Sequence, residues 1–238
     1  MTADFTNPGT TLMTDLHRAG GLAALVCAAT YIFGFAFLFA VLLPAGFGID
    51  GAEAEATLAA IAGARGAVTL WYFVIYVVNA LALAILAAAL AERIAIASPA
   101  LGRLTFGFGI VWTVLVLGAG MVMNVGLGRV LPLHEAGDPA ALELWRVVDL
   151  VENGLGGGNE IAGGAWALAL GIAGLVTGRL PKALCWGGLV IGASGLLTVL
   201  PGIGEVPGAV FGLGYIVWFL GAGVVLLRGR SARSGAPA

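Results

Sequence analysis

The charged residues of this chain are spread so unevenly that they constrain its fold more than any other feature. A charged side chain at the centre of a lipid bilayer costs about 2.5 to 3.5 kcal/mol on insertion scales, so membrane-spanning helices avoid charges. A spanning helix needs roughly 20 apolar residues, and about 17 are tolerated. Six uncharged stretches therefore have room for one helix each, and they cover residues 19–49, 66–91, 104–128, 161–178, 183–204 and 206–227.

The composition favours the same class of protein. Hydrophobic residues make up 60% of the chain and charged residues only 10%, whereas ordinary soluble domains contain roughly 25% charged residues. The 39 glycines fit close packing between membrane helices. A net charge of −2 provides no basic surface for nucleic acid, so we expect no nucleic-acid partner.

We predict an all-α fold, a polytopic bundle of six transmembrane helices that forms a single domain over residues 1–238. The uncharged stretches leave little chain for an independent soluble domain. The fourth span is the shortest. The predicted spans are residues 20–43, 67–91, 104–127, 160–178, 183–203 and 207–227.

Basic residues fall mainly on one side of these spans. Lys and Arg in short loops are retained on the cytoplasmic side of a membrane. Only Arg65, Arg129 and Arg146 lie on the side away from the two termini. Both termini are therefore expected in the cytoplasm, on the side that carries Arg18, Arg93, Arg103, Arg179, Lys182, Arg228, Arg230 and Arg233.

The main segment outside the spans, residues 138–155, has the pattern of an amphipathic helix. Asp138 and Pro139 are typical of a helix start. We predict an interfacial helix at the outer membrane surface, with Trp145 near the lipid headgroups and Glu152 away from the apolar stripe. A lid over an external cavity is the functional alternative. The predicted apolar stripe consists of Ala141, Leu144, Val148, Val151 and Leu155.

Two segments of the chain resemble each other across its halves. Residues 106–112 read FGFGIVW, and residues 211–218 read FGLGYIVW with one insertion. Three spans in each half would place the halves in opposite orientations, the 3+3 inverted repeat of many transporters. Chance similarity is the alternative in a chain this rich in Gly, Ala, Leu and Val.

Small residues also recur at helical spacing in two predicted spans. Gly163, Ala167 and Gly171 repeat every four residues, as do Gly188 and Gly192. Such faces let helices approach closely. We expect contacts within one bundle, and a homo-oligomer joined through the same faces is the alternative.

Five polar residues are candidate functional positions. Asn79 lies about midway through the second span, where an unpaired amide costs several kcal/mol, so it must face a partner or water. Asn124, Arg129, Asn159 and Glu160 are expected to converge on the outer side. A carboxylate there could couple a cation or proton. The favoured alternative is that Glu160 stabilises a helix N-terminus through its dipole, which makes Glu160→Gln mild.

The sequence predicts no catalytic, metal or cofactor site. Cys27 and Cys185 are not in a Cys-x-x-Cys arrangement, and the two histidines are His17 and His134. No serine, histidine and acid are available together within the predicted spans, so we expect the protein not to be an enzyme.

The C-terminal half resembles a bacterial family of six-helix, multi-pass membrane proteins without assigned function. The resemblance rests on residues 158–164, which read GNEIAGG, and residues 178–184, which read GRLPKAL. It implies a protein of the bacterial inner (cell) membrane, and it carries over no catalytic residue. We rank a non-enzymatic component that binds a lipid or a membrane partner first, a small-solute or cation/proton-coupled transporter second, and an intramembrane enzyme last.

Reporter fusions and cysteine labelling test the predicted orientation. A reporter that works only in the cytoplasm is expected to be active when fused after Arg230, and a cysteine at position 179 is expected to resist an impermeant maleimide added outside. Labelling of position 179 from outside would show that the number of spans or the orientation is wrong.

Overall fold

The computed structural model describes residues 8–47, 54–157, 160–200, 202 and 204–228, and every regular element among them is helical. Three short segments, marked η, are π-helical. In chain order the elements are α1 (Pro8–Phe37), η1 (Leu38–Leu42), α2 (Ala54–Gly63), α3 (Arg65–Tyr72), η2 (Phe73–Val78), α4 (Asn79–Ala95), α5 (Pro99–Glu135), α6 (Ala140–Glu152), η3 (Asn153–Gly157), α7 (Ile161–Thr177), α8 (Lys182–Leu197) and α9 (Glu205–Arg228).

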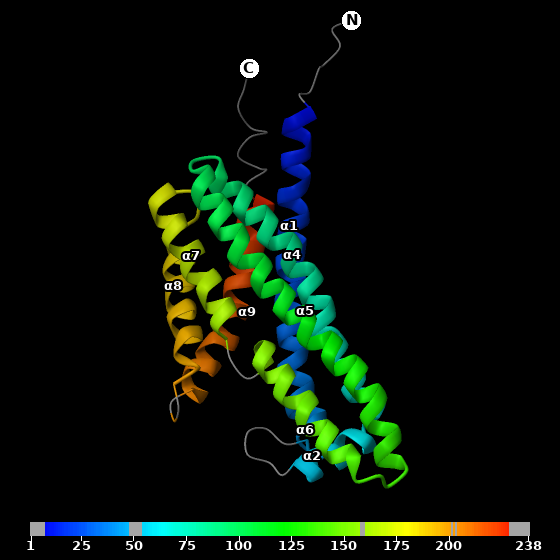
Figure 1. Cartoon of the computed structure of the whole chain (residues 1–238). Coiled ribbons are helices and arrows are strands. Elements are labelled where there is room, and N and C mark those ends of the chain that lie inside the picture. The colour runs from blue at the N-terminus through cyan, green and yellow to red at the C-terminus, as the bar shows by residue number, and fades with distance from the viewer. Residues whose placement is uncertain (1–7, 48–53, 158–159, 201, 203, 229–238) are drawn as a thin grey trace, which may run out of the picture.

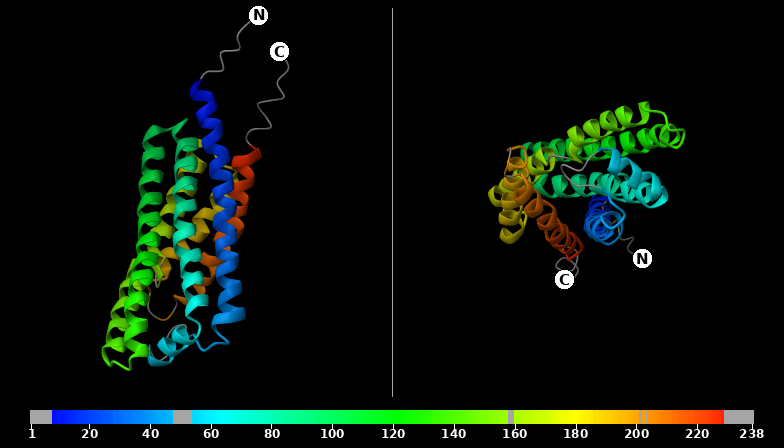
Figure 2. Two further views of the ribbon diagram at one scale, coloured as in Figure 1. Left: turned by 90° about the vertical axis from the view of Figure 1, so that its right-hand side faces the viewer. Right: turned by 90° about the horizontal axis from the view of Figure 1, so that it is seen from below.

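The long helices form an elongated bundle (Figure 1). Going round the bundle, α1 packs on α4, α4 on α5, α5 on α7, α7 on α8, and α8 on α9, which returns to α1. Figure 2 shows this arrangement from the side and along the bundle. The chain therefore closes a ring of six helices.

Five helical stretches are long and apolar enough to cross a membrane, which indicates a membrane-embedded protein. The predicted span at residues 183–203 corresponds instead to α8, which has only 16 residues. At 1.5 Å per residue α8 is about 24 Å long, shorter than a hydrocarbon core of roughly 30 Å. The five stretches are Asp15–Leu42, Arg65–Ala95, Pro99–Glu135, Ala140–Thr177 and Val206–Arg228.

Helix α5 extends well beyond its predicted span at residues 104–127. Its 37 residues correspond to about 55 Å. The side chain of Ser98 accepts a hydrogen bond from the backbone N–H of Leu101, and Pro99 occupies the first turn, so the helix has a well-capped start. The C-terminal part of α5 therefore offers a long apolar surface to α6, which returns beside it (Figure 1).

This contact corrects the prediction for the outer helix. Helix α6 is amphipathic, but Trp145 is only 2% exposed and Glu152 only 5%, so neither lies where the sequence predicted. Val151, a member of the predicted stripe, is 42% exposed. The buried face is Ala141, Trp145, Val148 and Glu152. The predicted orientation of the helix is wrong because α6 packs Trp145 and Val148 against the C-terminal part of α5, while its position relative to a membrane stays a prediction.

The bundle contains two hydrophobic cores. The first lies among α1, α4, α5, α7, α8 and α9, and the second lies among η1, α2, α3, the C-terminal part of α5, and α6. Tyr76 of η2 packs against both cores. The junction of the two cores is therefore at the level of η2.

The small residues identified in the sequence lie at contacts inside the bundle. A Cβ added at Gly192 would lie 2.7 Å from the carbonyl oxygen of Gly164, and one at Gly171 would lie 2.8 Å from that of Cys185. A Cβ at Gly188 would lie 3.1 Å from the carbonyl oxygen of Ala167. Helices α7 and α8 thus approach each other backbone to backbone. Gly163 faces Trp112 and Phe211 instead.

Substitution of Gly192 tests this packing. The new Cβ of Gly192→Ala would also lie 2.5 Å from Cγ of Leu168, so α7 and α8 must separate. We expect a loss of about 1 to 3 kcal/mol in the free energy of unfolding in detergent. Gly107→Ala is the control because its Cβ meets nothing within 4 Å. Equal stability of the two variants would contradict this packing.

Candidate functional site

The candidate site lies at the break between α6 and α7, about halfway along the bundle (Figure 1). Gly156 of η3 has a φ of +142°, a conformation that only glycine adopts readily, so the helix cannot continue regularly through it. The segment η3 marks this kink, whereas η2 is a π-helical segment of a kind that occurs frequently at functional sites. Both segments contact α5, which places them on the same side of the bundle.

Glu152 is held at this break by a tyrosine. Its carboxylate is buried at the end of α6, and the hydroxyl of Tyr76 donates a hydrogen bond to Oε1. Tyr72 stacks on Tyr76 with ring centroids 5.8 Å apart and an interplanar angle of 12°. Both tyrosines also interact electrostatically with Glu152. The carboxylate therefore faces a phenol pair on η2 and α3.

Glu160 approaches the same region from the other side of the break. It is the N-cap residue of α7, but its side chain makes no capping hydrogen bond. Its backbone N–H donates to Oγ1 of Thr198, 3.0 Å away. The carboxylate interacts electrostatically with Tyr31, Tyr76 and Tyr215.

We name these electrostatically coupled groups the acid–tyrosine cluster. It contains the four tyrosines of the chain and draws on both sides of the break. Tyr76 is the common neighbour of the two carboxylates. The members of the cluster are Glu152, Glu160, Tyr31, Tyr72, Tyr76 and Tyr215.

Neither carboxylate of the cluster forms an ion pair with a Lys or Arg in the part of the chain that the structure describes. Arg65 and Arg146 pair elsewhere, at 3.3 Å with Glu135 and at 2.6 Å with Glu143, and all four of these side chains are exposed. A carboxylate buried without a cation is costly unless it takes up a proton or a positive ion. The arrangement is therefore suited to binding one of these.

Aromatic rings form the first core next to the cluster. The ring centroid of Trp112 lies 5.4 Å from that of Trp166 and 4.9 Å from that of Tyr215. The hydroxyl of Tyr215 donates to the carbonyl oxygen of Gly163, 2.9 Å away. Nε1 of Trp166 is buried and has no hydrogen-bond partner within the described ranges.

Asn79, the mid-span candidate, joins two helices. Its side chain is buried, and Nδ2 donates to Oγ1 of Thr30 on α1 over 2.7 Å. The hydroxyl of Thr30 in turn donates to the carbonyl oxygen of Cys27, 2.8 Å away. The polar partner that the sequence predicted for Asn79 is therefore the hydroxyl of Thr30 on α1.

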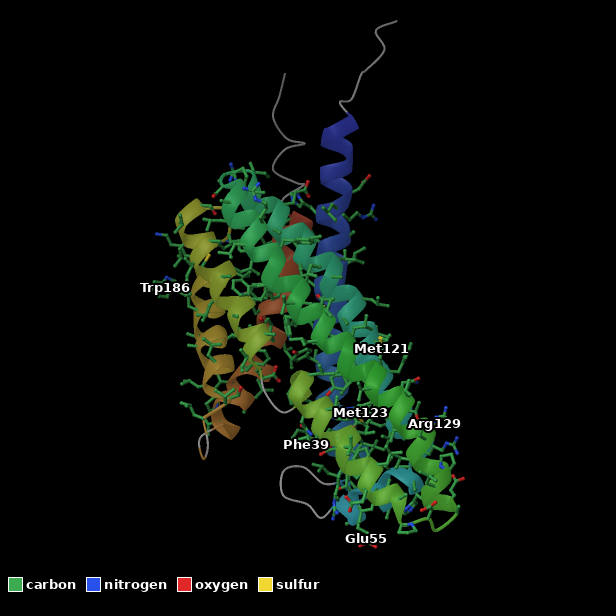
Figure 3. All side chains as sticks on the ribbon, in the orientation of Figure 1. Phe39, Glu55, Met121, Met123, Arg129 and Trp186 are labelled. Atoms are coloured by element: carbon green, nitrogen blue, oxygen red, sulfur yellow. The ribbon has the colours of Figure 1, made fainter. Side chains whose placement is uncertain are left out.

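The other predicted positions do not converge as expected. Arg129 is exposed on α5 and points away from the rest of the bundle (Figure 3). Asn124 is exposed and lines a groove between α3 and α5. Asn159 lies outside the described residues. Glu160 thus interacts electrostatically with tyrosines, and the structure brings neither Asn124 nor Arg129 into this set.

Sequence reasoning missed Glu152 and Tyr76. Residues 141, 145, 148 and 152 recur at spacings of four, three and four, so the sequence did contain a signal that the carboxylate lies on the buried face. That signal was hidden because the stripe through Leu144 and Val151 contains more large apolar residues.

Comparisons with known proteins leave this site to be interpreted from its geometry. No family model, no curated protein and no solved structure matches the chain. Within the described ranges, no group of three or more His, Cys, Asp or Glu side chains could hold a metal ion. The resemblance to a bacterial membrane family remains a prediction.

A double-mutant cycle tests the Asn79 contact. Thr30→Val and Asn79→Leu each remove one partner of the hydrogen bond, and the double variant removes both. We expect a coupling of about 0.6 kcal/mol, with an upper bound near 1.7 kcal/mol, in the free energy of unfolding in detergent. Thr113→Val is the control because the hydroxyl of Thr113 bonds to its own helix at Gly109. Additive effects of Thr30→Val and Asn79→Leu would contradict the contact.

Proposed function

We propose that the protein is a proton- or cation-coupled membrane transporter of a small solute, with the acid–tyrosine cluster as its coupling site. The observation that carries this proposal is the buried carboxylate of Glu152, which Tyr76 binds and no basic side chain among the described residues neutralises. Ionisable residues within membrane helices are rare and mark ion and proton pathways. The π-helical segment η2, which carries Tyr76, adds support because such segments occur frequently at functional sites.

This proposal reverses the order drawn from the sequence. A non-enzymatic component that binds a lipid or a membrane partner ranked first, but such a role needs no buried carboxylate in the bundle. It also gives Glu160 a coupling role in addition to the predicted helix-start role, because its carboxylate interacts electrostatically with the tyrosines of the cluster. An intramembrane enzyme remains third, since carboxyl and phenol groups suit proton transfer better than nucleophilic attack.

The proposed topology has six crossings and both termini in the cytoplasm of a bacterial cell, with the bundle in the inner membrane. Helix α1 begins and α9 ends at the same end of the bundle (Figure 1). At that end, Nε of Arg93 donates a hydrogen bond of 2.8 Å to the carbonyl oxygen of Arg179. This bond joins the end of α4 to the loop between α7 and α8. A helix as short as α8 can cross where the bilayer thins locally.

We also propose the inverted repeat, with α1, α4 and α5 equivalent to α7, α8 and α9. In this scheme α7 is equivalent to α1, and α5 is equivalent to α9. A contact between α1 and α9 therefore predicts a contact between α7 and α5, and both contacts are present. The tryptophans that end the two similar segments, Trp112 and Trp218, both contact Trp166. Glu160 and Tyr215 belong to one half, while Tyr31 and Tyr76 belong to the other, which fits a site at the repeat interface.

Replacement of Glu152 tests the proposed function. Glu152→Gln keeps the size of the side chain and an oxygen that accepts from Tyr76, so folding is expected to survive, but the site can no longer exchange a proton. Proteoliposomes loaded with a pH-sensitive dye and exposed to a sodium or potassium gradient report proton movement. We expect protein-dependent movement that falls about tenfold or more in Glu152→Gln, in the range of general acid–base effects.

Glu143→Gln is the matched control for this experiment. Glu143 lies on the same helix, its side chain is 73% exposed, and its substitution is expected to leave proton movement unchanged. Equal proton movement in Glu152→Gln and the wild type, with both proteins folded, would refute the coupling role of the cluster.

A further inference from the structure

A groove on the outside of α3, η2 and α5 shares Tyr72 with the acid–tyrosine cluster, but neither carboxylate of the cluster lines it. Its volume is about 260 Å³. One wall carries Arg65, Thr69 and Phe73 at helical spacing, and the other carries Asn124 and Gly128. Since α3 begins at Arg65 and the helix continues to Ala95, Arg65 marks the end of the groove farthest from Arg93.

The wall of the groove on α3 and η2 changes from polar to apolar along its length, while the wall on α5 carries Leu131 and Leu127 as well as Gly128 and Asn124. Arg65 and Thr69 lie at its mouth, and Phe73 and Val77 follow along the same helix. Residues 65 to 77 cover about 18 Å at 1.5 Å per residue, which is close to the roughly 15 Å hydrocarbon depth of one leaflet. The groove therefore matches a molecule with one charged end and an apolar tail as long as a leaflet is deep.

Arg65 retains the capacity to bind an anion. In the part of the chain that the structure describes, Arg65 forms an ion pair with Glu135 through one nitrogen at 3.3 Å, and both side chains are 60% exposed. Exposed pairs of this kind contribute little, at most about 1 kcal/mol. A guanidinium binds phosphate through two parallel hydrogen bonds, which is a stronger arrangement.

Gly128 leaves space for a ligand in the floor of the groove. A Cβ added at Gly128 would meet nothing within 4 Å. The glycine is therefore not needed there for helix packing, in contrast to Gly120, whose Cβ would lie 2.6 Å from Cβ of Tyr76. Phe73, which is 50% exposed, flanks the same space from the side of η2.

We propose that this groove binds a glycerophospholipid, with the phosphate on Arg65 and one acyl chain along Phe73 and Val77. The positive charge of Arg65 complements the phosphate. The length of the groove, which is close to the depth of one leaflet, fits an acyl chain. Asn124 adds an amide to the opposite wall, near the level of Phe73. This site does not require the carboxylates of the acid–tyrosine cluster.

Lipid binding to the delipidated, detergent-solubilised full chain tests the proposal. Native mass spectrometry measures binding of palmitoyl-oleoyl phosphatidylglycerol, of a diacylglycerol with the same chains, and of inorganic phosphate. We expect the phospholipid to bind best. We also expect Arg65→Gln and Gly128→Leu each to weaken its binding about tenfold, the first by removing the guanidinium and the second by filling the floor.

Two matched variants serve as controls. Arg129→Gln removes an exposed arginine of α5 that is not part of the groove, and Gly107→Leu places a side chain where a Cβ meets nothing within 4 Å. Both are expected to bind phospholipid as the wild type does. Equal binding by Arg65→Gln and Arg129→Gln would overturn the proposal, as would inorganic phosphate or diacylglycerol binding as tightly as the phospholipid. A wild-type dimer that Gly128→Leu dissociates would instead assign the groove to a second copy of the chain.

Discussion

Close approach of helices to α5 is the constraint on which the rest of the structure depends. A Cβ at Gly120 would lie 2.6 Å from Cβ of Tyr76, and one at Gly126 would lie 2.5 Å from Cγ1 of Val148. These two glycines let η2 and α6 pack against the same helix at short distance. This close packing brings the hydroxyl of Tyr76 within hydrogen-bonding distance of Glu152.

The same packing explains why a carboxylate lies between the two cores. Helix α6 buries Trp145 and Val148 against α5 and ends at Glu152, so burial of the apolar face takes the carboxylate with it. Tyr76 satisfies one oxygen, and the irregular backbone around Gly156 prevents a regular helix from continuing across the site. A proton or a cation then provides the neutralisation that the described protein groups do not.

Several features of the fold were predictable because they depend on local composition. Avoidance of charge in lipid located the long apolar helices, and the periodicity of residues 138–155 located α6. The length of α5 was underestimated because the predicted span was ended just before Arg129. In the structure Arg129 is exposed on a helix that continues to Glu135, since a charge ends a span without ending a helix.

The candidate site was only partly predictable for a related reason. Glu160 stood out because it precedes an uncharged stretch, and Asn79 because it interrupts one. Glu152 did not stand out, because α6 has two stripes that could be buried. Which of them is buried depends on the surface against which α6 packs. Tyr76 and Glu152 are 76 positions apart. Hydropathy, charge spacing and helix periodicity are properties of neighbouring residues, and they establish the class of protein and the places of its helices. The tertiary structure decides which face of a helix is buried, which carboxylate lacks a cation and where a groove opens. These features depend on distances between helices, and those distances are set by glycines and side chains on segments far apart in the sequence.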